Sequence, residues 1–328
     1  MKPLAIVSLG PGRMGRGIAH MFSFAGHRVT LSDFKPRTQA EYRRRHEEAL
    51  AEVGETLQFF VRAGLLSWAA LDDCIERIDF ATGDAAMRAI GEADIIFEAI
   101  PERLEEKQQL LARISAVAGR QTTIASTTST ILVDALADVV SNPERFLNAH
   151  FLNPAFLIPL VEVSPGHRTH ESVTESLETL LRSIGKVPVR CAPAPGFIVP
   201  RIQAAAMAEA ARIVEEGVAS AEDVDRAIQV GFGPRYTTMG LVEFIDWGGV
   251  DILYHACNYL NEALATERFT APEGVVERMN DGRRGLREGE GYYDYSNRDV
   301  DAYREAKLTS FVELLNHLKL LPASTANR

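Results

Sequence analysis

The sequence has little of what marks several classes of protein. Three of its 328 residues are cysteines, at positions 74, 191 and 257, and their wide separation gives neither a disulfide framework nor a metal-ligand spacing. We therefore expect buried thiols, no bound metal and a reducing, cytoplasmic compartment. No apolar run approaches the roughly 20 residues that cross a bilayer, and the short apolar stretch after Met1 is not a signal peptide. We expect no membrane partner.

An excess of positive charge is also lacking. The chain has 35 Lys and Arg against 45 Asp and Glu, a net charge of −10. Such a surface repels phosphate backbones, so we expect no nucleic-acid partner. With 46% hydrophobic and 24% charged residues, the composition is typical of a globular protein. At roughly 150 residues per domain, the length favours two domains.

The first part of the chain alternates short apolar runs with helical stretches. Repeated strand–helix–strand units are typical of a parallel sheet with helices on both faces. The expected strands cover residues 4–9, 27–33, 78–81, 94–99, 123–126, 145–153, 158–164 and 187–191.

The composition changes at residues 192–196, where the sequence Ala-Pro-Ala-Pro-Gly is typical of a linker. Beyond it, helical patterns cover residues 197–218, 221–230, 241–264 and 302–321. We therefore predict an α/β, Rossmann-type doubly wound domain over residues 1–192, followed by an all-helical domain over residues 193–328. The apolar density of the helical part favours a subunit interface over simple core packing.

A glycine pattern, G-P-G-R-M-G, follows the first expected strand and opens a helix. In this context Gly10 permits a tight turn, Gly12 lets a pyrophosphate approach the backbone, and Gly15 allows close helix–strand packing. The free amides at the start of the helix favour phosphate. Arg13 and Met14 belong to the same turn, so we predict that all five residues contact a dinucleotide.

The second expected strand ends at Asp33, eighteen residues after Gly15. A carboxylate at this position accepts hydrogen bonds from the adenine-ribose hydroxyls and repels a 2′-phosphate, which favours NAD over NADP. Lys35 and Arg37 lie just downstream and weaken that preference. FAD shares the fingerprint, but the chain is short for a flavin domain plus a substrate domain, so we predict NAD.

Three more polar residues lie past the carboxyl ends of expected strands, where doubly wound sheets bind their ligands. Glu102 and Lys107 follow the strand at 94–99; they fit either a ligand site or the charged, solvated start of a helix. Ser129 follows the next strand, and its hydroxyl fits either a substrate oxygen or a helix cap.

His150 and Glu162 lie in two consecutive apolar strands joined by a turn. Adjacent strands bring the two side chains into contact, and a carboxylate in such surroundings requires a partner. The pair alone fits either a structural or a catalytic role. Beside a dinucleotide, the catalytic role gains weight, because alcohol oxidation requires a base and a carboxylate fixes the tautomer of the imidazole.

In combination, these motifs resemble the L-3-hydroxyacyl-CoA dehydrogenase family, the NAD-dependent enzymes of β-oxidation and butyrate metabolism. The resemblance covers essentially the whole chain, through L-G-P-G-R-M-G-R-G-I-A, F-E-A-I-P-E-x-x-x-x-K, S-T-T-S, N-A-H-F-L-N-P, P-G-F-I-V-P-R and G-L-R-E-G-E-G-Y-Y. It implies NAD-dependent oxidation of a 3-hydroxyacyl-CoA, such as 3-hydroxybutyryl-CoA, to the 3-keto product and the reverse. It also implies a homodimer built on the helical domain.

The resemblance also implies roles for individual residues. The base is His150 with Glu162 as its partner, and Ser129 and Asn153 lie near substrate and nicotinamide. The NAD contacts that it implies are Asp33, Glu102, Lys107 and Arg287, the last at the place of a late lysine.

Several positions depart from the family. Pro200 stands where the family usually has an asparagine of the active site. Ala49 and Thr56 stand where better-known members use a serine and a lysine to hold CoA. In G-F-G-P-R-Y-T-T-M-G, Arg235 matches relatives that act on free hydroxy acids, the gulonate and carnitine dehydrogenases, and either binds a substrate carboxylate or serves the structure.

The alternative function is therefore the same chemistry on a CoA-free 3-hydroxy carboxylate. A more distant alternative is a non-catalytic, crystallin-like protein that binds NAD. The 3-hydroxyisobutyrate dehydrogenases also begin with such a glycine pattern, but they use a lysine in the helix after the linker, and none occurs here before Val218.

Overall fold

A computed structural model describes residues 2–321 of the chain. The chain forms two compact units, the first ending at Ala206 and the second beginning at Met207. The linker at residues 192–196 thus lies within the first unit. Our boundary after residue 192 stays a prediction of where independently folding domains meet.

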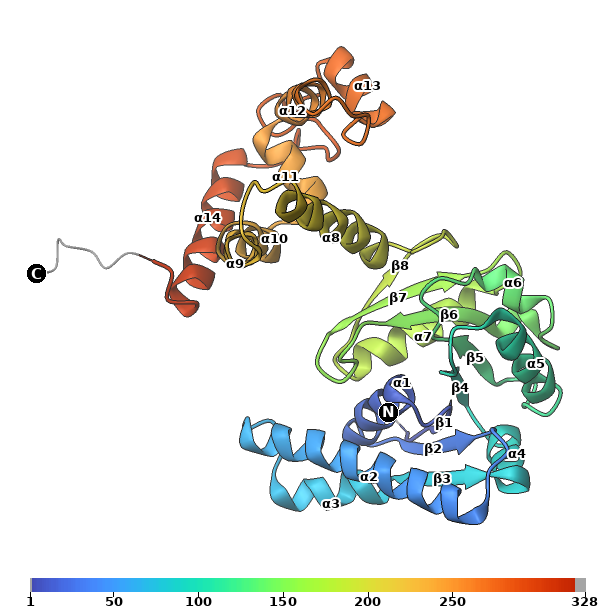
Figure 1. Ribbon diagram of the computed structural model, residues 1–328. Helices are drawn as coiled ribbons and strands as arrows, with labels where there is room; N and C mark the ends of the chain where they lie inside the picture. Colours follow the sequence, from blue (N-terminus) through green and yellow to red (C-terminus); the bar gives the residue numbers. More distant parts are fainter. Residues whose placement is uncertain (1, 322–328) are drawn as a thin grey trace, which may run out of the picture. The chain divides into compact units, whose positions relative to one another are not determined.

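The first unit contains one eight-stranded sheet (Figure 1). Its strands are β1 (Ala5–Leu9), β2 (Arg28–Asp33), β3 (Ile78–Thr82), β4 (Ile95–Glu98), β5 (Thr123–Ser126), β6 (Phe146–Phe151), β7 (Leu160–Pro165) and β8 (Val187–Arg190). The spatial order is β3-β2-β1-β4-β5-β6-β7-β8. Strands β1 to β6 are parallel, β7 is antiparallel to β6, and β8 is parallel to β7. The strand order changes direction between β1 and β4, which is where Rossmann-type sheets bind dinucleotides.

Helices cover both faces of this sheet. The helices of the first unit are α1 (Arg13–Phe24), α2 (Gln39–Arg62), α3 (Trp68–Glu76), α4 (Gly83–Gly91), α5 (Leu104–Ser115), α6 (Val133–Ala137), the short 3-10 helix η1 (Pro143–Arg145) and α7 (Glu171–Ser183). Helices α1, α2, α3 and α7 share a core with one face, and α4, α5 and α6 with the other. Successive strand side chains point to opposite faces, so Phe97 of β4 packs in the first core and Ile96 in the second. This arrangement confirms the predicted Rossmann-type fold.

The remaining elements are all helical. They are α8 (Val199–Glu215), α9 (Ala221–Ala227), the π-helical turn η2 (Ile228–Phe232), α10 (Gly233–Thr238), α11 (Leu241–Gly248), α12 (Val250–Ala263), α13 (Glu273–Asp281) and α14 (Val300–His317). Our prediction of a single helix over residues 241–264 was wrong. The chain breaks at Gly249, whose φ of +110° lies outside the helical region and is open to glycine. The sequence pattern also missed α13.

Among residues 2–321, no helix has the length and apolarity to span a bilayer. The same residues contain no group of three His, Cys, Asp or Glu side chains arranged to hold a metal ion.

Candidate active site

The turn between β1 and α1 has the geometry of a nucleotide-binding loop. Gly10 has a φ of +104°, and a Cβ there would lie 2.8 Å from the carbonyl oxygen of Ala99. A Cβ on Gly15 would lie 1.9 Å from the carbonyl oxygen of Gly10, so both positions exclude a side chain. A Cβ on Gly12, the N-cap of α1, would have no neighbouring protein atom within 4 Å. The space above Gly12 is therefore open to a ligand beside the helix amides.

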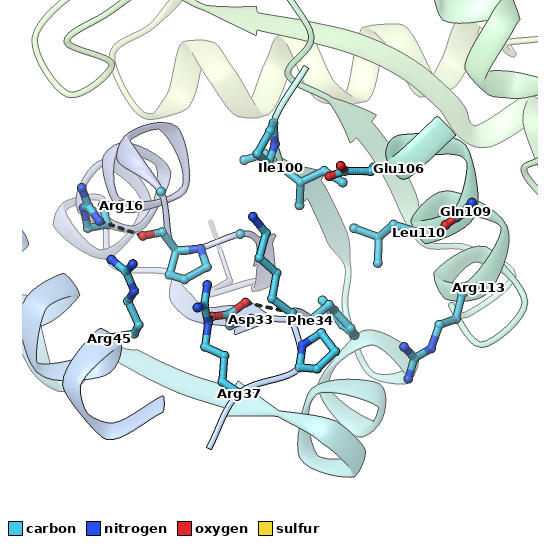
Figure 2. Close-up of a pocket in the computed structure, with 17 residues that line it drawn as sticks. Arg16, Asp33, Phe34, Arg37, Arg45, Ile100, Glu106, Gln109, Leu110 and Arg113 are labelled. Atoms are coloured by element: carbon cyan, nitrogen blue, oxygen red, sulfur yellow. Dashed lines mark hydrogen bonds and ion pairs between the residues drawn. The ribbon is translucent and has the colours of Figure 1, made fainter. Parts of the chain in front are cut away.

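A cavity of about 870 Å³ lies next to this turn and is lined by Gly10, Gly12, Asp33, Phe34, Ile100 and Leu110, among others (Figure 2). Its apolar side chains suit an adenine ring, its buried carboxylate suits ribose hydroxyls, and its glycine turn suits a pyrophosphate. The residues present thus fit the adenosine diphosphate part of NAD.

The end of β4 carries a buried ion pair that the sequence only partly indicated. The Nζ atom of Lys107 lies 2.7 Å and 2.9 Å from the two carboxylate oxygens of Glu98 and 3.1 Å from the carbonyl oxygen of Ile100. The Ser126 hydroxyl donates a further bond of 2.5 Å to Glu98. Both charged side chains are almost completely buried. Because an ammonium has three donors, these contacts satisfy Lys107 within the protein. Sequence reasoning missed Glu98, whose signal was a carboxylate inside a fully apolar strand.

Glu102 holds the loop that follows β5. Its Oε1 accepts bonds from the hydroxyl of Thr128 and from the backbone amides of Ser129 and Thr130, both at 3.0 Å. Burial raises the pKa of Glu102, but these hydrogen bonds and the charge of Lys107 outweigh it and hold the pKa below its usual value. Glu102 thus fixes the backbone of Ser129, whose own side chain is exposed.

The predicted contact between His150 and Glu162 is present. The two residues are direct partners in the antiparallel register of β6 and β7, and Nδ1 of His150 lies 2.7 Å from Oε2 of Glu162. An ionised carboxylate only accepts hydrogen bonds, so the ring carries its proton on Nδ1. Nε2 has no hydrogen-bond partner among the residues that the structure describes. This nitrogen is free to accept a proton.

Glu162 is also held by the start of α8. Its Oε1 accepts the backbone amides of Ile198 at 3.0 Å and Val199 at 2.7 Å. Pro200 comes next, within the first turn, where its missing N–H removes no bond that a helix needs. The fold therefore accommodates the departure from the family at this position.

Phe197 packs against the catalytic candidate and was not singled out by the sequence. Its ring stacks on His150 with centroids 5.6 Å apart, and its φ is +44°. A bulky residue in the left-handed region is strained, and such strain is concentrated at functional sites.

A second cavity, of about 320 Å³, lies between α1, α2 and the turn after β6. Its lining includes Arg13, His20, Thr56, Asn153 and Phe156. Both ring nitrogens of His20 are buried and have no hydrogen-bond partner. Two of the predicted site residues, Arg13 and Asn153, thus share this cavity.

The structure separates the predicted residues into groups. Met14 packs against the core of the first unit. Arg235 and Arg287 belong to the second unit. There, Arg235 lies over the ring of Phe244 at 5.0 Å, and Arg287 pairs with Glu288 at 2.7 Å and with Asp251 at 3.5 Å.

The sheet, the glycine turn and the acidic residue at the end of β2 define a dinucleotide-dependent oxidoreductase. Family profiles give the particular family: "3-hydroxyacyl-CoA dehydrogenase, NAD binding domain" matches residues 5–194, and the C-terminal domain of the same family matches residues 196–295. The chain belongs to the 3-hydroxyacyl-CoA dehydrogenase family, and NAD is its cofactor.

Three relatives show the extent of the similarity. The 3-hydroxyadipyl-CoA dehydrogenase of Escherichia coli is 35% identical over 93% of this chain, which spans 62% of the length of that enzyme. The 5-formyl-3-hydroxy-2-methylpyridine 4-carboxylate 5-dehydrogenase of Mesorhizobium japonicum is 30% identical over 94% of this chain and 97% of its own. A solved 3-hydroxyacyl-CoA dehydrogenase from Archaeoglobus fulgidus has a TM-score of 0.73 at 31% identity, over 97% of this chain and all of that one.

Proposed function

We propose that this enzyme oxidises the 3-hydroxyl of a 3-hydroxyacyl-CoA of the 3-hydroxybutyryl-CoA type to the 3-ketone, and catalyses the reverse reduction. The observation that carries the proposal is the orientation of His150. Glu162 takes Nδ1, and Nε2 is left without a partner in the described part of the chain. The relatives named as acyl-CoA dehydrogenases support the substrate class.

In this proposal Nε2 of His150 takes the proton of the 3-hydroxyl, since a neutral imidazole is a base near neutral pH. Bound NAD supplies the hydride acceptor. Glu162 stabilises the imidazolium that results, because its carboxylate is already hydrogen-bonded to Nδ1. The two amides at the start of α8 keep that carboxylate in place. In the reverse direction the same imidazolium returns the proton to the ketone oxygen.

The remaining predicted contacts belong to the same proposal. Ser129 and Asn153 bind the substrate oxygen and the nicotinamide side of the cofactor. Lys107 holds Glu98 at the end of β4, Glu102 holds the loop of Ser129 beside the cofactor, and Arg287 is a further proposed contact of the cofactor. The turn residues around Gly12 bind the pyrophosphate.

A second candidate is the same chemistry on a CoA-free hydroxy carboxylate. The two helix positions that hold CoA in better-known members offer little here. Ala49 is fully buried, and the hydroxyl of Thr56 donates to the carbonyl of Val53 at 2.8 Å. The name of the Mesorhizobium relative contains a pyridine carboxylate and no CoA, which supports a carboxylate without CoA as the substrate class.

One assay separates the two candidates. NADH consumption is measured with acetoacetyl-CoA and, at equal concentration, with free acetoacetate, 3-dehydrocarnitine and a sugar keto acid. A kcat/KM at least tenfold higher for acetoacetyl-CoA supports the first candidate, and the reverse order supports the second. Absence of turnover with every carbonyl compound would contradict both.

We also propose a homodimer formed through the helical domain. Large apolar side chains of the second unit are exposed, which marks an interaction surface when they are contiguous; they include Met207, Val218, Ile252, Tyr259, Leu308 and Val312. Analytical ultracentrifugation tests this, with a mass of twice 36.1 kDa expected. A monomer at micromolar concentration would contradict it.

A further inference from the structure

The carboxylate that selects NAD in this fold is already paired. Nε of Arg37 lies 2.7 Å from Oδ2 of Asp33, and the backbone amide of Lys35 donates to Oδ1 at 3.1 Å. Asp33 is buried, whereas the Arg37 side chain keeps 22% of its surface exposed. Part of the negative charge that would repel a 2′-phosphate is therefore neutralised inside the protein.

The cavity around this pair is rich in positive charge. Its cationic lining residues are Arg16, Lys35, Arg37, Arg45 and Arg113. Two carboxylates, Asp33 and Glu106, line the same cavity. The local excess of cations is opposite in sign to the net charge of −10 for the whole chain. Such a local field attracts an additional phosphate.

One of these arginines has donors available beside Asp33. Arg37 uses Nε on Asp33, and its terminal nitrogens form no bond to another described residue. Arg45 also lines the cavity, but its guanidinium pairs with Glu48 at 3.1 Å and its Nε is buried. A guanidinium binds phosphate through two parallel N–H groups. The other arginine near the glycine turn, Arg16, is engaged by the Pro11 carbonyl and Glu52.

We propose that the adenosine end of this cavity accepts a 2′-phosphorylated ribose as well as an unmodified one, so that the enzyme binds NADP as well as NAD, and that Arg37 decides this tolerance. The guanidinium of Arg37 contacts the 2′-phosphate through its free N–H groups while Nε remains on Asp33. When the ribose is unmodified, Asp33 accepts its hydroxyls through the capacity that Arg37 leaves.

The test is a binding measurement on the full chain without substrate, so its outcome does not depend on the proposed reaction. Isothermal titration calorimetry gives Kd for NAD⁺ and NADP⁺ with the parent protein and with Arg37→Ala. Loss of a charge-assisted hydrogen bond to phosphate weakens binding by roughly tenfold to hundredfold. We expect this loss for NADP⁺, and a change of less than about threefold for NAD⁺.

The matched control is Arg44→Ala. Arg44 lies on α2, seven residues after Arg37, and pairs with Glu48 at 3.5 Å, but it does not line the cavity. The Arg44→Ala substitution removes the same charge from the chain and should leave the ratio of the two Kd values unchanged. The fragments 2′,5′-ADP and 5′-AMP repeat the comparison without the nicotinamide half.

The proposal is supported if Arg37→Ala weakens the binding of NADP⁺ at least tenfold more than the binding of NAD⁺. A smaller difference overturns it, as does undetectable binding of NADP⁺ to the parent protein. Thermal unfolding checks that the variant is folded, and a variant that is not folded is replaced by Arg37→Gln, to which the same criterion applies.

Discussion

Two carboxylates of the same sheet, Glu98 at the end of β4 and Glu162 within β7, are fully buried but bind different kinds of partner. Glu98 faces the ammonium group of Lys107. Glu162 faces the imidazole of His150. Both carboxylates have additional donors, the hydroxyl of Ser126 and the backbone amide of Ile100 in one case and two backbone amides in the other.

The two pairs differ in the polar groups that they leave free for a ligand. Every donor of Lys107 is used within the protein, so this pair joins β4 to the start of α5 and leaves no group for a ligand. His150 uses one ring nitrogen and keeps the other. The burial of a charged pair therefore does not identify a catalytic group. The free ring nitrogen of His150 supports its proposed role as the base.

The largest effect expected is on turnover. His150→Ala removes the proposed base, and general base catalysis contributes roughly a hundredfold to ten-thousandfold. We expect kcat to fall by that factor, with Kd for NAD⁺ within about threefold of the parent. Stopped-flow or steady-state kinetics and calorimetry measure the two quantities.

The matched control is His167→Ala. His167 also pairs with a carboxylate, Asp134, at 2.6 Å, but its side chain is 83% exposed. This variant should keep the parent kcat. If His150→Ala also kept the parent kcat, the distinction between the two buried pairs would be wrong.

The second prediction concerns stability. Lys107→Met leaves Glu98 buried without its counter-charge, and removal of one partner from a buried pair costs about 3–5 kcal/mol. We expect the free energy of unfolding in urea to fall by that amount. Arg103→Met breaks an exposed pair with Glu106, 2.7 Å long and close by in the chain, and should cost less than about 1 kcal/mol. Equal losses in the two variants would show that burial of the Glu98 pair carries no special weight.

A smaller effect is expected at the other carboxylate. Glu162→Gln keeps the shape of the side chain but loses the charge that stabilises an imidazolium on His150. We expect kcat to fall roughly tenfold to hundredfold, with KM changed less. Each pKa unit of lost imidazolium stabilisation corresponds to a factor of ten. The pH profile of kcat should shift as well. Unchanged kcat and an unchanged profile would mean that Glu162 only holds α8.

Much of this could be predicted from the sequence, because the relevant patterns are local. Short apolar runs between helical stretches predicted the strands, and the contact of His150 with Glu162 followed from two consecutive strands joined by a short connection. The residues that were missed act over longer separations. The amides of Ile198 and Val199 reach Glu162 from 36 and 37 positions away, and Ser126 reaches Glu98 from 28.

Side-chain geometry was also beyond the sequence pattern. Asp33 and Arg37 were both recognised, but periodicity does not show that one guanidinium nitrogen binds the carboxylate while the others stay free. The break at Gly249 was missed because the apolar periodicity continues through it, although the Gly248-Gly249 dipeptide is itself a turn signal.

The smallest effect concerns a third buried polar group, which has no partner. Both nitrogens of His20 lack a hydrogen bond, and its ring packs against Phe60 and Phe156 at 4.8 Å and 4.9 Å. Burial, with a contribution from the charge of Lys186, lowers the pKa of His20 to about 4. The imidazole of His20 binds a proton below about pH 6.5 in the unfolded chain but only below about pH 4 in the folded chain. The free energy of unfolding therefore decreases as the pH is lowered through this interval.

His20→Phe removes this titration, so between pH 7 and pH 5 the parent should lose about 2 kcal/mol more unfolding free energy than the variant. Urea unfolding at pH 7, 6 and 5 measures the difference, and comparison of slopes cancels any change in packing at pH 7. Lys186 does not contribute in this window, because its pKa of about 8 in the folded chain and its higher value in the unfolded chain both lie above it. Parallel plots of unfolding free energy against pH for parent and variant would show that water reaches the ring of His20 in the folded chain. The imidazole would then be tolerated at this position without a carboxylate partner.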